Sequence, residues 1–210
     1  MLIQPELEVV DTLTWALQAI RDDPDVLTEI FGSRPPEEQE EILTFLGQRE
    51  VPVRLAFPRD PTELPGYYVN LGLSRESNQP IGMYVGDEKV SDERYEEFSG
   101  VFFDGSVRVI CVASDNTAIP VWLGEIARWA CLRYREALQK RGLLEQMVQI
   151  TDFEPMPTWF PTLVFRRDVI LGFKALATVL QVYPALRELD VTGEADSGDR
   201  GTYQVTLKGK

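Results

Sequence analysis

The sequence predicts an α+β fold, in which a long amphipathic helix packs on an antiparallel or mixed β-sheet and an N-terminal helical segment precedes both. Apolar residues in the first fifty positions recur every three or four residues, which is helical spacing. From Val51 the chain is divided into short runs rich in β-branched and aromatic residues, separated by Pro, Gly, Asn and Ser. Helical spacing returns in residues 118–142.

The first fifty residues are predicted to form three helices. The first begins near Pro5 and has an apolar face made of Leu7, Val10, Leu13, Leu17 and Ile20. The second runs from Pro24, with Asp23 as a candidate N-cap, to Gly32. The third, residues 35–47, has acids in its first turn, where the helix dipole favours them. We therefore interpret its EEQEE run as a helix start with a solvated face, not as a metal site.

Strands are expected in the remaining chain. The expected ranges are 51–57, 67–73, 81–87, 147–155 and 162–173, followed by a C-terminal hairpin of 186–193 and 202–209 around the polar loop 194–201. We divide the chain into an N-terminal helical segment, 1–50, and an α+β core with this C-terminal hairpin, 51–210, which together are expected to form one continuous structural unit.

The dipeptide Asp104-Gly105 lies between the apolar runs FSGVFF and SVRVICVA, a pattern that predicts a tight two-residue hairpin. In the second run, Val107, Val109, Cys111 and Ala113 share one face. Because Ile110 and Val112 on the other face are also apolar, we expect the second half of this strand to be covered on both faces.

Residues 118–142 are predicted to form one amphipathic helix. Asp115, Asn116 or Thr117 is the candidate cap, Pro120 fits the first turn and Gly142 ends the helix. Its apolar stripe comprises Leu123, Ile126, Ala127, Ala130, Tyr134 and Leu138. This helix is expected to lie across the sheet.

The composition limits the possible functions. The chain has 34 acidic and 21 basic residues, and its net charge of -13 argues against tight non-specific nucleic-acid binding. Cys111 and Cys131 lie in apolar surroundings and are expected to be buried thiols, although a disulfide between them stays open. The sequence has no secretory signal pattern and no apolar run of membrane-spanning length, so we expect synthesis in the cytoplasm and no membrane partner.

No catalytic, cofactor-binding or metal-binding residue is predicted. The sequence has no histidine, which excludes Ser-His-Asp and Cys-His catalysis and the usual zinc ligand sets. It also lacks a phosphate-binding glycine loop. The acidic stretches 91–97 and 194–201 lack the spacing of a calcium loop. Trp159, in the segment PMPTWFP, is expected to be exposed and to contact a partner protein.

The order of these elements matches a known family pattern. The strand VRVICVAS enters a helix through DNTAIP, the helix reads WLGEIARWACLRYREALQKRGL, and the strands ITDFEP and TLVFRRDVILGF follow a little later. Over roughly residues 50–180, this order resembles the neck and tail-terminator proteins of tailed bacteriophages, particularly those with contractile tails.

The resemblance implies a virion structural protein without enzymatic activity, made in the host cytoplasm. It would form a ring, commonly a homohexamer, that terminates the tail tube and joins the tail to the head connector. The partners would be tail tube, sheath and connector proteins, and DNA would pass through the lumen without specific binding or cofactors. The acidic excess suits such a lumen, because like charge prevents sticking.

Candidate subunit-interface residues lie on the charged side of the long helix. They are Glu125, Arg128, Arg135 and Glu136, together with Trp159. The alternative for the four charges is simple solvation, which is usual for surface ion pairs. Two other functions stay open. A monomeric adaptor would bind a peptide at a sheet edge, and a carboxylate-dependent enzyme would need a concave pocket with converging acids.

Overall fold

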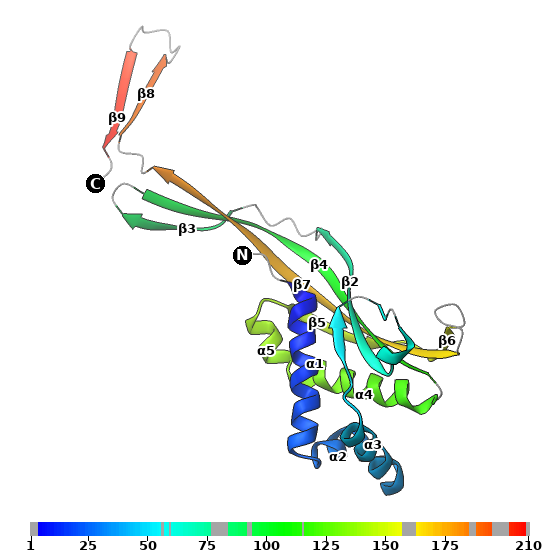
Figure 1. Ribbon diagram of the computed structural model, residues 1–210. Coiled ribbons are helices and arrows are strands. Elements are labelled where there is room, and N and C mark those ends of the chain that lie inside the picture. The colour runs from blue at the N-terminus through cyan, green and yellow to red at the C-terminus, as the bar shows by residue number, and fades with distance from the viewer. Residues whose placement is uncertain are drawn as a thin grey trace. The chain divides into compact units, whose positions relative to one another are not determined.

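The computed structural model describes residues 4–55, 57–58, 60–76, 84–91, 94–114, 116–156, 163–184, 188–194 and 202–208 (Figure 1). The chain divides into two compact units. The core unit comprises Leu2–Asn78 and Phe102–Ala177, and the hairpin unit comprises Gln79–Val101 and Thr178–Lys210. Two long strands, β4 (Arg94–Ser114) and β7 (Val164–Pro184), contribute residues to both units.

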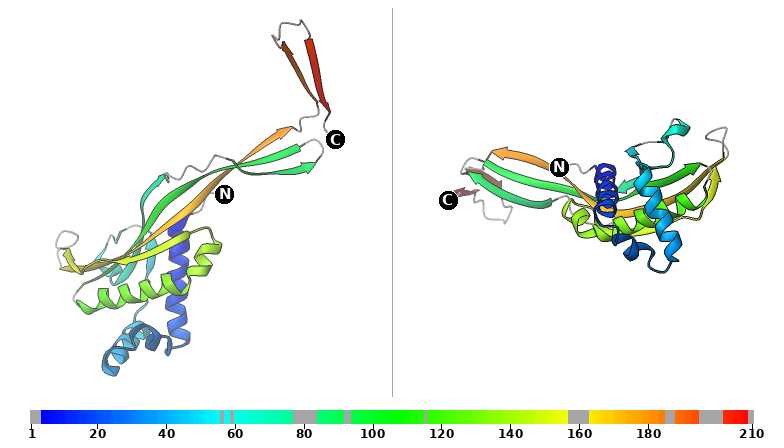
Figure 2. Two further views of the ribbon diagram at one scale, coloured as in Figure 1. Left: turned by 180° about the vertical axis from the view of Figure 1, so that it is seen from behind. Right: turned by 60° about the horizontal axis from the view of Figure 1, so that its bottom comes forward.

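The described residues of the core unit form helices and a sheet, which confirms the predicted α+β class. The helices are α1 (Pro5–Asp22), α2 (Val26–Phe31), α3 (Pro36–Gln48), α4 (Ala118–Arg133) and α5 (Arg135–Lys140). Figure 2 shows α1, α4 and α5 on one side of the sheet. None of the helices among the described residues has the length and apolarity that a membrane span requires.

The sheet of the core unit is mixed, as predicted. Its strand order is β1-β2-β4-β7-β5, and β6 also pairs with β7. The bounds are β1 (Val53–Leu55), β2 (Gly66–Glu76), β5 (Leu144–Ile150) and β6 (Glu154–Met156), with a 3-10 helix, η1 (Pro61–Glu63), between β1 and β2. Strand β1 runs parallel to β2, whereas β2 is antiparallel to β4, and β5 and β6 are antiparallel to β7.

Two strand pairs of the hairpin unit are described here. β3 (Tyr84–Ser91) is antiparallel to the first part of β4, from Arg94 to Ser99. β8 (Glu188–Glu194) and β9 (Thr202–Lys208) are antiparallel to each other and form a separate two-stranded sheet. The predicted C-terminal hairpin is therefore present, although residues 195–201 of its polar loop lie outside the described part.

One hydrophobic cluster joins the helices to one face of the sheet. Alternate strand residues point into it, because successive side chains of a strand face opposite ways. The cluster includes Val9, Leu13 and Ile20 of α1, Leu27 and Phe31 of α2, Ile42 of α3, Tyr67 and Val69 of β2, Val107, Val109, Cys111 and Ala113 of β4, Leu123, Ile126 and Ala130 of α4, and Val169, Leu171 and Phe173 of β7. The helices of the first fifty residues thus share their core with the sheet.

The buried face of α1 differs in part from the prediction. Leu13, Leu17 and Ile20 are buried as expected, but Leu7 is 41% exposed and Thr12 is buried instead. Burial of Thr12 is possible because its hydroxyl donates a hydrogen bond to the Glu8 carbonyl at 2.7 Å, so no polar group is left unsatisfied.

The second half of β4 is covered on both faces, as predicted. On the face away from the helices, Ile110 and Val112 are buried in a smaller cluster with Leu64, Tyr68 and Val164. The Tyr68 hydroxyl donates to the Glu63 carbonyl at 2.7 Å, which connects the η1 segment to this face.

The predicted hairpin at Asp104-Gly105 is wrong, because β4 continues through this dipeptide. Asp104 pairs with Arg75 and Gly105 pairs with Ser74 of β2. A Cβ atom added to Gly105 would lie 2.6 Å from Cζ of Phe173, which is buried in the core cluster. The glycine therefore permits the close approach of an aromatic ring within a strand and does not serve a turn.

The single helix predicted for residues 118–142 is also wrong in one respect, because it is interrupted at Tyr134. This residue has φ -96° and ψ 17°, and its ring packs edge-on against Trp15 and Trp129 with centroid separations of 6.1 and 6.3 Å. The two ends agree with the prediction. The Asn116 side chain accepts a hydrogen bond from the Ala118 amide at 2.8 Å, and Gly142 adopts a φ of 95° after α5.

Cys111 and Cys131 are free, buried thiols. Burial raises the pKa of Cys111 well above its ordinary value and raises that of Cys131 from 9.0 to about 12. Between about pH 9 and pH 12, the folded chain therefore retains thiol protons that the unfolded chain releases. The contribution of the protonated thiols to the free energy of unfolding is fully present below about pH 9 and is lost as the pH rises towards 12.

We expect the urea midpoint of unfolding to fall as the pH rises above about 9, and Cys131→Val to show a weaker fall than the original chain. Both thiols should stay unlabelled by DTNB in the folded chain and react fully in urea. Fast labelling of the native protein would contradict their burial.

Gly105→Ala is expected to lower the free energy of unfolding by about 1–3 kcal/mol, because the added methyl group meets the Phe173 ring. Gly47→Ala is the matched control. Its added Cβ has no neighbour within 4 Å, and alanine favours helix α3, so stability should stay unchanged or rise by up to about 1 kcal/mol. Urea denaturation measures both changes, and equal stabilities of Gly105→Ala and the original chain would contradict the close approach of Phe173.

Candidate interaction surfaces

The outer face of α4 carries a small ion-pair network centred on Glu125. Its carboxylate lies 3.5 Å from Arg128 Nη1, one turn along the helix, and 3.4 Å from Arg167 Nη1 of β7. The Arg167 stem passes over Gly124, where an added Cβ would lie 3.1 Å from Arg167 Cδ. The Arg128 side chain is 51% exposed, so it is the member of this network that is most open to solvent.

The other predicted interface residues lie elsewhere. Arg135 Nη2 donates to the Gln146 carbonyl at 3.3 Å, and Gln146 Nε2 donates back to the Arg135 carbonyl at 3.2 Å, so this arginine connects α5 to β5. Glu136 is exposed. The structure thus brings Glu125 and Arg128 together, whereas Arg135 serves an internal contact. Trp159 lies outside the described residues.

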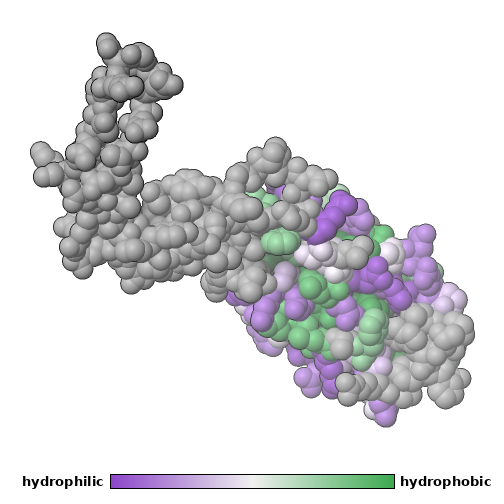
Figure 3. Space-filling model, turned by 90° about the horizontal axis from the view of Figure 1, so that it is seen from above, coloured by the Kyte–Doolittle hydropathy of each residue, from purple (hydrophilic) through white to green (hydrophobic). Residues whose placement is uncertain are grey.

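Among the described strands of the core unit, β1, β5 and β6 each pair with one neighbour, and β1 and β5 lie at the two ends of the strand order. Both of these end strands display large apolar side chains. Leu55 of β1 is 47% exposed and Met147 of β5 is 58% exposed. In Figure 3, apolar residues of the described part gather between hydrophilic ones on the side seen from above. Strand edges with unpaired backbone groups and apolar neighbours are sites where another chain adds a strand.

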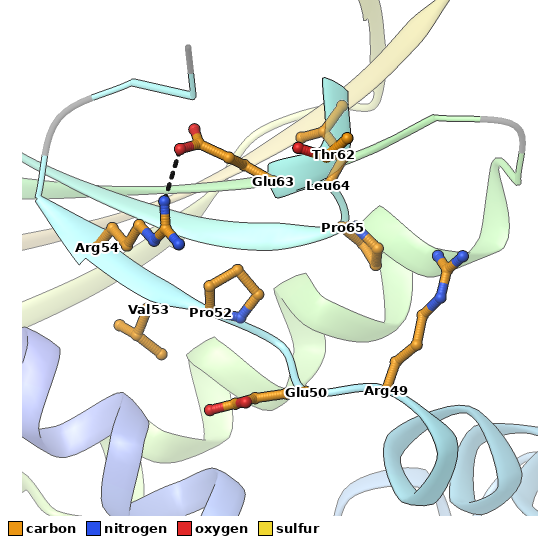
Figure 4. A pocket seen from close by; sticks show the side chains of 9 residues that line it. All are labelled: Arg49, Glu50, Pro52, Val53, Arg54, Thr62, Glu63, Leu64 and Pro65. Carbon is orange, nitrogen blue, oxygen red and sulfur yellow. Dashed lines mark hydrogen bonds and ion pairs between the residues drawn. The ribbon is translucent and has the colours of Figure 1, made fainter. Parts of the chain in front are cut away.

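A cavity of about 780 Å³ lies beside β1, between the α3–β1 connection and the η1 segment (Figure 4). Arg54 points across it to Glu63, with 2.6 Å between Nη1 and Oε1. Arg49 also lines the cavity, and its exposed side chain has no ion pair within the described part of the chain. Glu50 also lines the cavity, so its two arginines are balanced by two glutamates, and Pro52, Val53, Leu64 and Pro65 supply apolar surface.

A charged cluster on the face of the sheet away from the helices was not predicted from the sequence. Asp168 of β7 is only 2% exposed. Arg166 donates to both of its carboxylate oxygens, with 2.6 Å from Nε to Oδ1, and Arg108 Nε lies 3.7 Å from Oδ2. Hydrogen bonding to Asp168 raises the pKa of the Arg166 guanidinium. The available signal was the i, i+2 spacing of Arg166 and Asp168, which places both on one face of a strand.

Two cations share one buried carboxylate in this cluster. The Asp168 backbone is also fixed, because its amide donates to Thr151 Oγ1 at 3.0 Å and its carbonyl accepts from the Thr151 amide at 2.8 Å. The Arg108 side chain is 48% exposed, so the cluster presents a positive group to solvent. Within the described ranges, no group of three or more His, Cys, Asp or Glu residues is arranged to hold a metal ion.

The described surface thus offers charged outer helix faces, half-paired sheet edges and exposed apolar side chains, where partner proteins can bind. Residues 6–115, slightly more than half of the chain, match the family model described as "Phage termination protein". The chain belongs to this phage termination protein family. The match confirms the resemblance to phage terminator proteins, and the family points to a structural role in the phage and not to catalysis. No curated protein matches the chain.

Asp168→Asn is expected to lower the free energy of unfolding by about 2–3 kcal/mol, because Arg108 and Arg166 would face each other without the charge that neutralises them. Asp152→Asn is the matched control, since Asp152 is exposed, and it should change stability by less than about 0.5 kcal/mol. Chemical denaturation compares them, and equal effects of the two variants would contradict a structural role for the cluster.

Proposed function

We propose that this protein is a virion structural component of the phage neck, which forms a ring that terminates the tail tube and joins the tail to the head connector. The observation that carries the proposal is the family match over residues 6–115. A ring of six copies is the assembly that the resemblance implies. Its partners are other copies of the chain, the tail tube and sheath subunits and the connector proteins.

The acidity of the chain supports the passage of DNA through such a ring. With a net charge of -13 per chain, a lumen lined by these subunits repels the phosphate backbone. Non-specific DNA binding depends on neutralising phosphates with Lys and Arg, and an acidic lumen does not supply such contacts. DNA therefore slides through without being held.

Self-association in a ring requires one heterologous contact that is repeated at every subunit boundary. The outer face of α4 is a candidate for one side of this contact. Arg128 is 51% exposed and has a single long ion pair within the helix, so its guanidinium is available to an acidic group of a neighbour. Glu136 is a second exposed charge on α5. Arg135 contributes to the same region indirectly, by holding α5 against β5.

Arg128→Glu is expected to weaken self-association, because it places a negative charge where an acidic neighbour would bind. Arg133→Glu is the matched control. It makes the same charge change on an exposed position of α4, on a different side of the helix. Sedimentation velocity should show loss of the oligomer for Arg128→Glu and retention for Arg133→Glu.

The location of the protein in intact particles tests the function itself. Density or labelling at the junction of tail and head supports the proposal. A chain that stays monomeric at high concentration and is absent from this junction would contradict the ring, and would favour a monomeric adaptor that binds a peptide at a sheet edge.

A further inference from the structure

The charges of the core unit are unevenly distributed among its helices. Residues 4–50, which contain α1, α2 and α3, have twelve acidic and three basic residues, a net charge of -9. Residues 118–141, which contain α4 and α5, have five basic and two acidic residues, a net charge of +3. Two copies therefore attract each other, despite the acidity of the whole chain, where the α4–α5 side of one meets the N-terminal helices of the other.

The outer face of α4 and α5 displays three exposed residues at successive turns. Arg128, Leu132 and Glu136 are spaced four apart, and a single residue separates the two helices, so the three follow one another along one face. Leu132 is apolar and yet 44% exposed. The Arg128 side chain has one long ion pair, to Glu125, which Arg167 also neutralises. This stripe thus presents a cation, an apolar side chain and an anion in that order.

A pocket of about 350 Å³ lies between the end of α1 and the second half of α3. Its lining residues are Ile20, Arg21, Pro24, Leu43, Leu46 and Gly47. A cavity of about 150 Å³ can hold a benzene ring, so this pocket has room for a leucine side chain. A Cβ atom added to Gly47 would have no neighbour within 4 Å, so the space in front of this residue is open.

The charges around this pocket complement the stripe. Glu40 precedes Leu43 by three residues on α3, so it lies one turn from the pocket on the same side of the helix, and it is exposed. Arg21 lines the pocket on the α1 side, and the exposed Asp22 and Asp25 follow it, so the surroundings of the pocket are acidic overall. Within the described part of the chain, neither Glu40 nor Arg21 has an ion pair. A cation such as Arg128 is attracted to these surroundings, and Arg21 gives an accompanying acid a cation to approach.

The stripe and the pocket lie towards opposite ends of the core unit. Helix α1 packs against β1 and β2, at one end of the strand order, whereas α4 and α5 pack against β5 at the other end. A contact between opposite ends adds each copy in the same direction, as a closed ring requires.

We propose that Leu132 of one copy inserts into the pocket between α1 and α3 of a second copy. Arg128 then lies beside Glu40 of the second copy, and Glu136 lies beside Arg21. This inference rests on the proposed ring, for which it names both surfaces of the repeated contact. Because the inserting helix and the receiving pocket are different surfaces, the contact is heterologous.

A charge swap in the full chain tests the pairing. Arg128→Glu and Glu40→Arg are each expected to lower the association constant about tenfold in sedimentation velocity, because each places like charges at the contact. The chain with both substitutions should associate within about twofold of the original. Arg128→Glu combined with Glu41→Arg is the matched control, with the same net charge. Glu41 is also exposed on α3 but lies about 100° further round the helix, so this combination should not restore association.

Oxidative cross-linking tests the insertion itself. A chain with Leu132→Cys and Gly47→Cys carries one thiol on the stripe and one at the pocket, so mild oxidation should link copies into a ladder on a non-reducing gel. Leu7→Cys with Gly47→Cys is the matched control, because Leu7 is 41% exposed on α1, and it should give no ladder. The native thiols of Cys111 and Cys131 are buried and do not contribute links.

The outcomes separate this contact from the ring. Urea midpoints of unfolding should stay close to that of the original chain for every variant, which verifies that the core unit is intact. Restored association in the swapped chain together with the ladder supports the inference. An oligomer that persists in both single charge variants, or that forms no ladder, overturns the inference while the ring stands. A chain that remains monomeric and unlinked at high concentration overturns both.

Discussion

Burial of β4 on both faces is the constraint on which the rest of the core unit depends. Val107, Val109 and Cys111 face the helices, whereas Ile110 and Val112 face the η1 segment, and all are at most 1% exposed. A strand of this kind has to be central, with other strands on each side and a cover above and below. The Tyr67 hydroxyl of the neighbouring strand donates to the Leu123 carbonyl at 2.9 Å and thereby fixes α4 over the sheet. Since the chain itself covers the middle of the sheet, edges and outer helix faces are what it offers to partners.

Local patterns in the sequence predicted most of the elements, because each depends on residues close together in the chain. The alternation in SVRVICVA correctly indicated a strand with two covered faces, and Asn116 and Gly142 correctly marked helix ends. The errors have distant causes. In the local sequence Gly105 has the pattern of a turn glycine, but in the structure it allows the close approach of the Phe173 ring. The helix is interrupted at Tyr134, whose ring packs against Trp15 of α1. Neither partner can be identified from the local sequence.

Among the charged residues, too, local spacing predicts some contacts and the arrangement of distant elements determines the others. An outer face for Glu125 and Arg128 follows from helical spacing alone, and the structure pairs these residues. The bond from Arg135 to Gln146 depends on how α5 meets β5, which helical spacing does not encode. Likewise, Arg166 and Asp168 share a face by spacing, but the approach of Arg108 requires β4 and β7 to be neighbours in the sheet. Residue spacing thus identifies members of a cluster on one element, and strand order supplies the others.

The net charge would impose two opposed requirements on the proposed ring. A charge of -13 per chain would keep DNA from adhering to the lumen, but it would also make each subunit repel the next. Salt screens charges separated by more than about 8 Å at physiological ionic strength, so the long-range part of this repulsion is reduced while close contacts still have to be favourable. Favourable contacts require cations at the boundary and apolar area to bury. Arg128, whose side chain is 51% exposed on the outer face of α4, is a cation that could serve at such a boundary. In the proposed ring, acidic subunits can therefore assemble if exposed cations such as Arg128 lie at the subunit boundaries and acids line the lumen.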